Sequence, residues 1–391
     1  MDFTLTPEQE QLQKTAHDFA AQEIRPVATA LDKEPDPMKR FPWDVLEKGS
    51  KLGLRTLALP KDMGGAGCDI LTLCLVGEEL AWGDLGTAVT FDQTWKITHL
   101  FEKLTNKGQR ERYLKAFLED HHFHLAVGMT EESGGTDNII PYDSPDAGVR
   151  TTAVRDGDGW TANGKKRYIS NGGIAKLCIV AMRTDTTKGV SEGMTYFIIT
   201  PGMDGFRYGK IHDKMGQRLS LNAELIFENC RVPDENRITE VNRATEARRM
   251  FVPGSNIEAA ATVLGTARAA YEDALAHAKS RIQGGKPIIE HQAVGFMLAD
   301  CFAEYEASRR LLHYAAWTAG QKDLYDPKMG FMTKCFVSES SYRIATRALE
   351  VWGGTGYMTD APMEKYLRDV TSFLHSDGTN QAMRIRSMKF L

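Results

Sequence analysis

The chain has 391 residues, of which 42% are hydrophobic, and its formal net charge is −4. This length supports a large core, divided into two or three domains rather than one. The balance of charges, without a run of basic residues, argues against nucleic acid or an anionic membrane as a partner. The N-terminal stretch MDFTLTPEQEQLQKTAHDFA lacks an apolar signal region, and no segment approaches the length of a membrane span, so we expect a cytoplasmic protein.

Apolar residues recur mostly three and four positions apart from residue 7 to about 124, as in PEQEQLQKTAHDFAAQEI and LTLCLVGEELAW. This is the period of helices with one buried face, and we expect an all-α domain over residues 1–125. Its last segment, HHFH, offers the imidazoles of His121, His122 and His124. Further ligands at a metal-binding spacing are missing, so we interpret HHFH as a solvated helix end and predict no metal site.

The pattern changes between residues 126 and 235 to short β-rich runs such as KLCIVAMRT, TYFIIT and AELIFENCRV. The runs are separated by DGDG, NGKK, NGG and PGMDG, which are turn and hairpin signals. We expect a β-barrel-like middle domain here.

The helical period returns after RVPDEN and continues to the end of the chain. Ile257, Ala261, Leu264, Tyr271 and Leu275 form one apolar stripe, and long helical segments joined by short loops follow. Such segments predict a four-helix bundle over 236–391, which makes the whole chain an α+β protein of mainly α structure. A cleft between the β domain and the helical parts is a typical place for a cofactor or a small ligand.

The common nucleotide and nucleophile motifs do not fit. The stretch GGTG at Gly353–Gly356 lacks the G-x-G-x-x-G frame, and the chain contains neither a P-loop nor a G-x-S-x-G elbow. Two other motifs remain. GMTEESGGTD could bring backbone N–H groups and the Thr130 and Thr136 hydroxyls to a polar ligand, or it could be a simple loop. KRYISNGG places Tyr168 and Ser170 on one face of a strand end, where the ring could stack on a ligand or serve the fold.

Near the carboxyl end, HSDGTNQ contains Asp377 followed by Gly378. Asp-Gly is a common turn signal, because Gly accepts a positive φ and the Asp side chain can bond nearby N–H groups. Taken alone, the dipeptide favours a turn residue over a catalytic one.

Together, the successive blocks GLRTLALPKDMGGAG, GMTEESGGTD, NGKKRYISNGG, MGQRLSLNAELIFENCRVP, RIQGGKPIIEHQ, EVWGGTGYMTDAPMEKYLRD and DGTNQAMR resemble those of the acyl-CoA dehydrogenase family. The resemblance covers nearly the whole chain. It implies a helical, a β and a helical-bundle domain, a homotetramer with one FAD per subunit, an acyl-CoA substrate, and an electron-transfer flavoprotein as the acceptor.

The resemblance also implies a set of site residues. Thr130, Tyr168 and Ser170 would contact the isoalloxazine ring, and Thr379 and Gln381 would lie at the pyrophosphate and adenosine. The implied cofactor-binding residues of the same subunit are Met129, Thr130, Gly135, Thr136, Tyr168, Ser170, Thr379 and Gln381. Those that would complete the dinucleotide site between subunits are Arg281, Gln292, Glu350, Gly353 and Gly354. The implied substrate-binding residues are Phe91, Thr136, Asn256 and Gly378.

Several positions depart from the family pattern. Tyr168 stands where Trp is usual, Thr136 where Ser is usual, and Gly284 where Phe is common. Glu350 replaces a common Gln at the adenine, and Asn256 replaces an Arg that contacts CoA in many members. The last two put the adenine and CoA contacts in doubt.

At Asp377 the family normally has Glu, the base that removes the proton α to the thioester, so the resemblance implies that Asp377 is the base. Asp is shorter than Glu by one methylene, about 1.5 Å. A misplacement of about 1 Å can cost about 100-fold in rate, so a straight-chain pocket with Asp should work poorly. A substrate whose α-carbon lies in a ring is wider at that point. The chain resembles the members that act on cyclohexane- and cyclohexene-carboxyl-CoA and carry Asp here.

A second carboxylate, Asp92, lies in the segment that lines the acyl pocket by resemblance. It could be a surface residue paired with Lys96 four positions on. Alternatively, it could face the pocket as a second base. Two carboxylates beside one ring would permit a 1,4-dehydrogenation of cyclohex-1-ene-1-carboxyl-CoA to a conjugated diene, which is our leading hypothesis.

Three alternatives remain open. They are the 1,2-dehydrogenation of cyclohexanecarboxyl-CoA or of a short branched acyl-CoA, a flavin oxidase that resembles nitroalkane oxidase and also uses Asp as its base, and a non-catalytic FAD-binding homologue.

Overall fold

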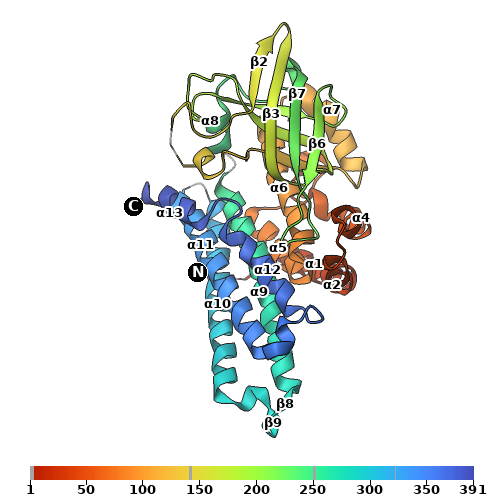
Figure 1. Cartoon of the computed structure of the whole chain (residues 1–391), viewed down its shortest axis with the longest axis vertical. Coiled ribbons are helices and arrows are strands. Elements are labelled where there is room, and N and C mark those ends of the chain that lie inside the picture. The colour runs from red at the N-terminus through yellow and green to blue at the C-terminus, as the bar shows by residue number, and fades with distance from the viewer. Residues whose placement is uncertain (1–3, 141–142, 250–251, 322) are drawn as a thin grey trace.

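The structure is a computed structural model that describes residues 4–140, 143–249, 252–321 and 323–391. It places a sheet above a bundle of long helices, with the N-terminal helices at the side (Figure 1). This mainly helical arrangement, with β structure in the middle of the chain, confirms the expected fold class. Among the helices of these ranges, none combines the length and the apolar character needed to cross a membrane.

Short polar side chains start the N-terminal helices. Thr6, Asp69 and Asp84 each accept a backbone N–H of the following first turn, which satisfies donors that the helix leaves free. The later pair of long helices, α5 and α6, is largely buried beside the bundle and the sheet. The helices of this part are α1 (Pro7–Phe19), α2 (Arg25–Asp32), α3 (Pro37–Arg40), α4 (Trp43–Lys51), α5 (Ile70–Gly83), α6 (Leu85–Leu104) and α7 (Lys107–Glu119).

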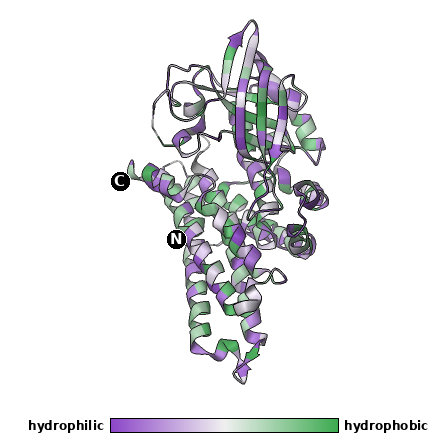
Figure 2. Ribbon diagram, in the orientation of Figure 1, coloured by the Kyte–Doolittle hydropathy of each residue, from purple (hydrophilic) through white to green (hydrophobic). Residues whose placement is uncertain are grey.

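The strands form a mixed sheet in the order β1-β4-β2-β3-β7-β6, and β5 pairs with β4. Alternate side chains of β4 enter two cores: Ile179 packs with α6 and α7, whereas Val180 packs with β3 and β7 across the curled sheet. Polar and apolar positions alternate along several strands in Figure 2. The strands are β1 (His124–Gly128), β2 (Thr152–Asp156), β3 (Gly159–Ser170), β4 (Ala175–Arg183), β5 (Met194–Ile199), β6 (Phe206–Ile211) and β7 (Asn222–Pro233).

The long helix α9 runs through the C-terminal bundle and also packs against α5. A Cβ on Gly265 would lie 2.0 Å from the carbonyl oxygen of Glu78, so the close approach of α5 and α9 requires glycine there. The remaining elements are α8 (Ala244–Arg249), α9 (Val252–Ser280), β8 (Ile282–Gln283), β9 (Lys286–Pro287), α10 (Gln292–Ala319), α11 (Pro327–Trp352), α12 (Met363–Thr371) and α13 (Asn380–Met388).

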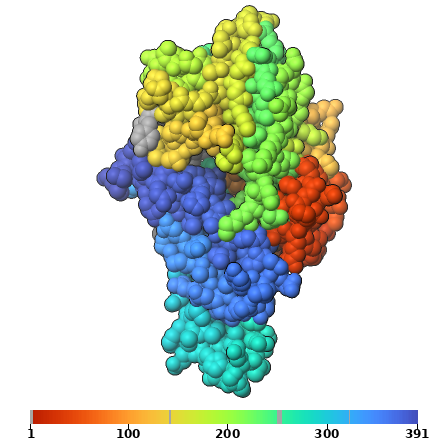
Figure 3. Space-filling view, in the orientation of Figure 1, coloured from red at the N-terminus to blue at the C-terminus, as the bar shows by residue number. Residues whose placement is uncertain are grey.

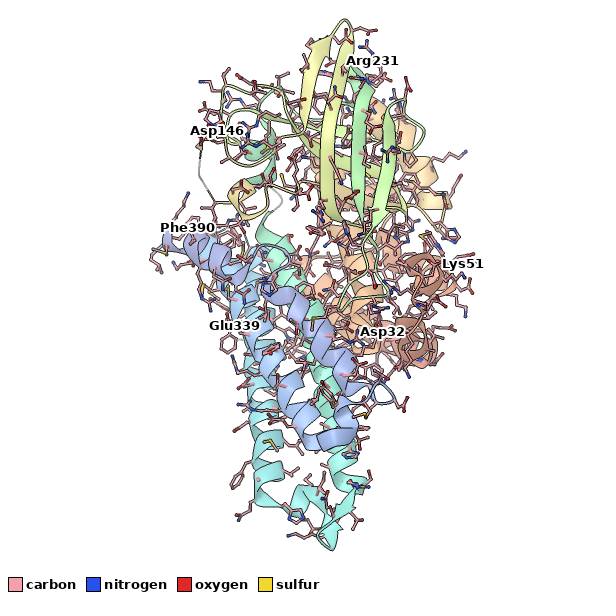
Figure 4. The ribbon with its side chains drawn as sticks, in the orientation of Figure 1. Asp32, Lys51, Asp146, Arg231, Glu339 and Phe390 are labelled. Carbon is pink, nitrogen blue, oxygen red and sulfur yellow. The ribbon has the colours of Figure 1, made fainter. Side chains whose placement is uncertain are left out.

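The loop between β6 and β7 joins all three parts. It reaches down from the sheet between the N-terminal helices and the bundle (Figure 3). Its Gln217 N–H donates to Asp369 Oδ1 on α12 at 2.6 Å. Its Arg218 Nε donates to the carbonyl of Asp32 at 2.9 Å, and Asp32, labelled in Figure 4, also accepts from Arg368 of α12 at 2.6 Å. These contacts fix the sheet relative to the helices beneath it.

Candidate active site

Asp377 lies in a tight turn that opens α13. The φ angles of Asp377 and Gly378 are +52° and +85°, so both residues take the left-handed conformation that glycine accepts freely and Asp tolerates. A Cβ on Gly378 would lie 2.3 Å from Met383 Cε and 3.0 Å from Ile139 Cδ1. Thr379 follows as the N-cap of α13 and accepts the N–H of Ala382. The turn therefore forms as the Asp-Gly signal predicts.

Side chains from two bundle helices hold the carbonyl groups of this turn. Asn256 Nδ2 of α9 donates to the Asp377 carbonyl at 2.9 Å. Lys334 Nζ of α11 donates to the Gly378 carbonyl and to Asn380 Oδ1, both at 2.8 Å. Burial lowers the pKa of Lys334 to about 8. The backbone that presents Asp377 is thus bound to both α9 and α11.

The carboxylate of Asp377 meets the side chain of Lys96. Lys96 Nζ lies 3.0 Å from Asp377 Oδ2 and 2.7 Å from Asp92 Oδ2, one helical turn earlier on α6. The pairing of Asp92 with Lys96 is present, but the surface position considered for it is wrong, because Asp92 is 1% exposed and Lys96 is 2% exposed. One buried ammonium group therefore joins the two carboxylates singled out in the sequence.

A third acid, Glu258 of α9, belongs to the same cluster and is 2% exposed. Burial, together with the negative charge of Asp92, raises the pKa of Glu258 to about 8. Burial also raises the pKa of Asp92, to about 6, although Lys96 opposes this change. Burial disfavours the charged form of Lys96. The negative charges of Asp377 and Asp92 outweigh this effect, so the pKa of Lys96 is raised. The site is a largely buried cluster of three carboxyl groups, two of which pair with the same cation.

A cavity of about 190 Å³ lies beside this cluster. Met129 and Thr130 reach it from the end of β1, Asn256 from α9, and Asp377 and Gly378 from the turn. The rest of its lining is Leu100, Val127, Ile139, Tyr196, Arg248, Ser255 and Arg386.

Phe91, Asp92 and Thr136, which were predicted at the pocket, do not line this cavity. Asp92 lies behind Lys96, and its Oδ1 has no hydrogen-bond partner among the described residues. Phe91 is fully buried, with its ring 6.4 Å from that of Trp95. An acyl ring would therefore meet Asp377 first.

A second cavity, of about 440 Å³, adjoins the first, since Ile139, Arg248 and Arg386 line both. Its walls combine cations with aromatic rings, including Lys389 and Phe390, the latter labelled in Figure 4. Arg248 Nη1 donates to the carbonyl of Asn138 at 2.8 Å. Two arginines thus line both hollows, and Lys389 adds a further cation in the second, near the C-terminus.

Residues predicted around a flavin gather at the edge of the sheet nearest the cavity. The Arg167 N–H donates to the Thr130 carbonyl at 2.8 Å, which ties the end of β3 to the end of β1. Tyr168, with φ +60°, presents a ring that is 52% exposed, and Ser170 Oγ accepts from Asn222 at 3.1 Å. Gly135 and Thr136 lie in the loop after β1, where Asp137 accepts the Gly135 N–H.

The residues predicted for the dinucleotide end are divided between two distant places. Gln381 lies at the start of α13 beside a cavity of about 370 Å³. Arg281 and Gln292 are exposed at the opposite end of the bundle, and α9, which leads there, has 29 residues, roughly 43 Å of helix. Gly353 and Gly354 have open space around them, and Glu350 is exposed on the last turn of α11. A single subunit does not bring these two sets together.

The interpretation of HHFH as a solvated helix end is wrong for His124. His124 is completely buried at the start of β1, where Nδ1 lies 3.2 Å from Thr94 Oγ1. His121 contacts Ser50 and His122 contacts Glu47. Within the described ranges, His, Cys, Asp and Glu side chains form no group of three or more that could hold a metal ion.

Three functional candidates escaped the sequence reasoning: Glu258, Lys334 and the bridging role of Lys96. Glu258 is a lone acid in the apolar stretch IEAAATVLG, and this could have marked it. The other two roles depend on contacts with the distant turn at Asp377 and carry no local signal.

Three family models together match most of the chain. They are the acyl-CoA dehydrogenase N-terminal domain over residues 6–120, the middle domain over 126–230 and the C-terminal domain over 254–391. Two relatives are each 34% identical to this chain, and each alignment covers 97% of this chain and 97% of the relative. They are a short-chain-specific acyl-CoA dehydrogenase of Megasphaera elsdenii and a cyclohex-1-ene-1-carbonyl-CoA dehydrogenase of Geobacter metallireducens. A chain in a solved structure described as electron transferring flavoprotein of Acidaminococcus fermentans is 34% identical, with a TM-score of 0.91, and the match covers 100% of this chain and 99% of that one.

Proposed function

This chain belongs to the acyl-CoA dehydrogenase family and is an FAD-dependent oxidoreductase, and from this premise we propose that it oxidises an alicyclic acyl-CoA thioester with Asp377 as the base. The observation that carries the proposal is the Asp377 carboxylate itself. It borders a small cavity on a turn held by Asn256 and Lys334, and Lys96 fixes one of its oxygens. A carboxylate held in one orientation beside a substrate cavity is suited to remove a weakly acidic C–H proton.

The residues of the cavity wall fit a bound flavin. Met129 and Thr130 line the cavity that Asp377 also lines, and Tyr168, which is half exposed, lies at the adjoining strand end. FAD bound there would accept the hydride that leaves the substrate. The protein would hold the substrate between Asp377 and this wall and keep water from the reacting carbon.

The short base and the small cavity favour a ring at the α-carbon. The side chain of Asp reaches about 1.5 Å less far than that of Glu, and a ring fills that gap. The cavity beside Asp377 has a volume of about 190 Å³, which suits a compact acyl group. The relative in Geobacter metallireducens that acts on a cyclohexene thioester agrees with this choice, whereas the short-chain relative offers the linear alternative.

For cyclohex-1-ene-1-carboxyl-CoA the electrons balance as a 1,4-dehydrogenation. A carboxylate takes the γ-proton, hydride leaves the ring carbon on the other side of the α-carbon, and the electron pair of the broken C–H bond completes a conjugated diene. We assign the removal of this proton to one of two candidate bases: Asp377, which borders the cavity, or Asp92. Asp92 retains one carboxylate oxygen that is unpartnered among the described residues, and Lys96 keeps it next to Asp377.

The CoA portion would extend through the larger cavity. The Asn256 amide is engaged by the Asp377 carbonyl, so it holds the base turn instead of reaching a phosphate. Arg248 and Arg386 line both cavities, and Lys389 lines the second. Cations along this path would pair with the CoA phosphates.

A homotetramer would complete the cofactor site. The predicted dinucleotide residues lie at opposite ends of one bundle, and a neighbouring subunit can bring them together. Exposed apolar side chains along α10 and the loop after α11 agree with a covered surface, among them Phe296 (66% exposed) and Tyr357 (74% exposed). We also propose an electron-transfer flavoprotein as the acceptor, in keeping with the family.

Anaerobic titration of the holoenzyme tests the substrate class. Cyclohex-1-ene-1-carboxyl-CoA, cyclohexanecarboxyl-CoA, isobutyryl-CoA and butyryl-CoA are compared by the rate at which they bleach the flavin absorbance. We expect the ring thioesters to bleach the flavin at least about tenfold faster than butyryl-CoA. Mass spectrometry will identify the oxidised products. Faster bleaching by butyryl-CoA would refute the ring assignment, and hydrogen peroxide formation from a nitroalkane would identify an oxidase instead.

The role of Asp92 is tested by the ratio of two rates in Asp92→Asn. Oxidation of the cyclohexene thioester should fall about 100-fold or more, and oxidation of cyclohexanecarboxyl-CoA, which needs loss of the α-proton, should fall much less. An equal loss for both substrates would remove Asp92 from the proton removal.

A further inference from the structure

Lys96 occupies one oxygen of each carboxylate in the cluster and leaves the other oxygen available. Its Nζ contacts Oδ2 of Asp92 and Oδ2 of Asp377 at 2.7 and 3.0 Å. Asp92 Oδ1 has no hydrogen-bond partner among the described residues, and the Asp377 side chain remains 24% exposed beside the cavity. A base held by one oxygen can present its second oxygen to a C–H bond in a fixed direction.

Glu258 is close enough to influence this pair electrically and yet is not ion-paired. Within the described part of the chain, Lys96 pairs with Asp92 and Asp377 and not with Glu258, whose Oε2 lacks a hydrogen-bond partner. The charged and titratable groups that face Glu258 are Asp92 and Lys96 from α6, Asp377 from the turn and Cys74 from α5. Burial raises the pKa of the Cys74 thiol well above its usual value, so Cys74 adds no charge near neutral pH.

The charge balance of the cluster requires a retained proton. Even with the Lys334 ammonium, which also faces Asp377, counted beside Lys96, three ionised carboxylates would leave one uncompensated negative charge in a largely buried site, which is unfavourable. Glu258, the acid without an ion pair, is the group that keeps its proton, and its pKa of about 8 agrees with this assignment. An ionised Glu258 would instead compete with Asp377 for the ammonium group of Lys96, whose contact with Asp377 is longer than its contact with Asp92.

We propose that Lys96 is the positioning residue that aims Asp377 at the substrate, and that Glu258 preserves this arrangement by remaining a neutral acid. The inference rests on the proposed role of Asp377 as the base. When Asp377 accepts the substrate proton, its charge is neutralised and Lys96 remains paired with Asp92. The cation therefore stays in place through the reaction. When Glu258 loses its proton, Lys96 is drawn away from Asp377 and the base loses its orientation.

The test compares Lys96→Gln and Glu258→Gln in the holoenzyme, with kcat and KM measured from pH 6 to 9.5 using the acyl-CoA that reduces the wild-type flavin fastest. Lys96→Gln should lower kcat about 100-fold and change KM by less than about threefold, and Lys96→Arg should recover part of the loss. In the wild type, kcat should decline above about pH 8, by up to about tenfold per pH unit. Glu258→Gln should remove this decline, because its amide cannot ionise.

Exposed residues on α7 provide matched controls. Lys107 and Glu111 form a surface pair whose side chains are 90% and 67% exposed, so Lys107→Gln and Glu111→Gln should keep the wild-type pH profile. Should Lys96→Gln fail to fold, the pH profile of Glu258→Gln still decides the question. The inference would be overturned if Lys96→Gln kept the wild-type kcat, or if kcat of Glu258→Gln still declined at alkaline pH. These results count against the inference alone when the wild type oxidises acyl-CoA and Asp377→Asn does not. If no acyl-CoA reduces the wild-type flavin, the proposed function fails instead.

Discussion

Two lysine-bridged pairs of aspartates involve α6, one at its N-terminus and one in its middle, and their difference separates a structural cluster from a reactive one. Lys365 joins Asp84 and Asp369 at 2.5 and 2.6 Å, much as Lys96 joins Asp92 and Asp377. Each lysine is buried, and each has an aspartate four residues away on its own helix. Burial raises the pKa of Asp369 as it does that of Asp92, so burial alone does not distinguish the two clusters.

The clusters differ in what happens to the remaining carboxylate oxygens. Asp84 Oδ1 caps α6 by accepting the N–H and the hydroxyl of Thr87, and Asp369 Oδ1 accepts the Gln217 N–H at 2.6 Å. Around Lys96, by contrast, Asp92 Oδ1 lacks a partner among the described residues and Asp377 borders a cavity. A closed network stabilises the fold, whereas an open one keeps hydrogen-bonding capacity for a ligand. Substitutions in the two clusters should therefore differ in kind.

The largest effect on stability is expected for Lys365→Met. Removal of this cation leaves the buried Asp84 and Asp369 without their ion pair, and breaking such a pair costs about 3–5 kcal/mol of the free energy of unfolding. Urea unfolding monitored by circular dichroism measures the change, and the molecules that remain folded should keep near-normal kcat. A free energy of unfolding equal to that of the wild type would contradict the structural role.

Gly378→Ala should act mainly on turnover. Its φ of +85° and the overlap of a Cβ with Met383 and Ile139 would displace the base turn. We expect kcat to fall about 100-fold, as for a misplacement of about 1 Å. Gly202→Ala is the control, since Gly202 has a φ of +92° but open space around it. It should lose about 1 kcal/mol of stability and keep its activity. Equal kcat values in the two variants would show that the turn does not place the base.

Lys334→Met should give an intermediate result, because Lys334 supports the open cluster from outside. Loss of its bonds to Gly378 and Asn380 leaves two buried acceptors less satisfied, which should cost about 1–3 kcal/mol. The turn would remain held by Asn256, so kcat should fall by no more than about tenfold. A loss of kcat as large as that of Gly378→Ala would mean that Lys334, and not Asn256, fixes the turn.

The last prediction concerns the pH dependence of stability. The pKa of Glu258 is raised from 4.5 to about 8 in the folded protein, so between these values the folded state keeps a proton that the unfolded state has released. Stability should therefore fall as pH rises through this window. Thermal unfolding at pH 5.5 and 8 should show a smaller drop in Tm for Glu258→Gln than for the wild type. Identical drops would show that Glu258 does not keep its proton.

The comparison also shows what could be predicted from the sequence. The change from helical to strand periods predicted the order of the three parts, and Asp-Gly predicted the turn at Asp377, since both are local signals. Lys96 and Asp92 were visible as a pair, but the third member, Asp377, is 281 residues away from Lys96 and is brought there by tertiary packing. The prediction for His124 failed for a similar reason. Its burial depends on packing against α6, and the local sequence HHFH gives no sign of that contact.

Rapid anaerobic mixing of wild type and Asp377→Asn with the preferred acyl-CoA tests the central claim most directly. The Asn side chain keeps the shape of the turn but cannot take a proton, so flavin bleaching should slow about 1,000-fold or more, while thioester binding, followed by the shift in the flavin spectrum, should remain. If Asp377→Asn bleaches within about tenfold of the wild-type rate, Asp377 is not the base.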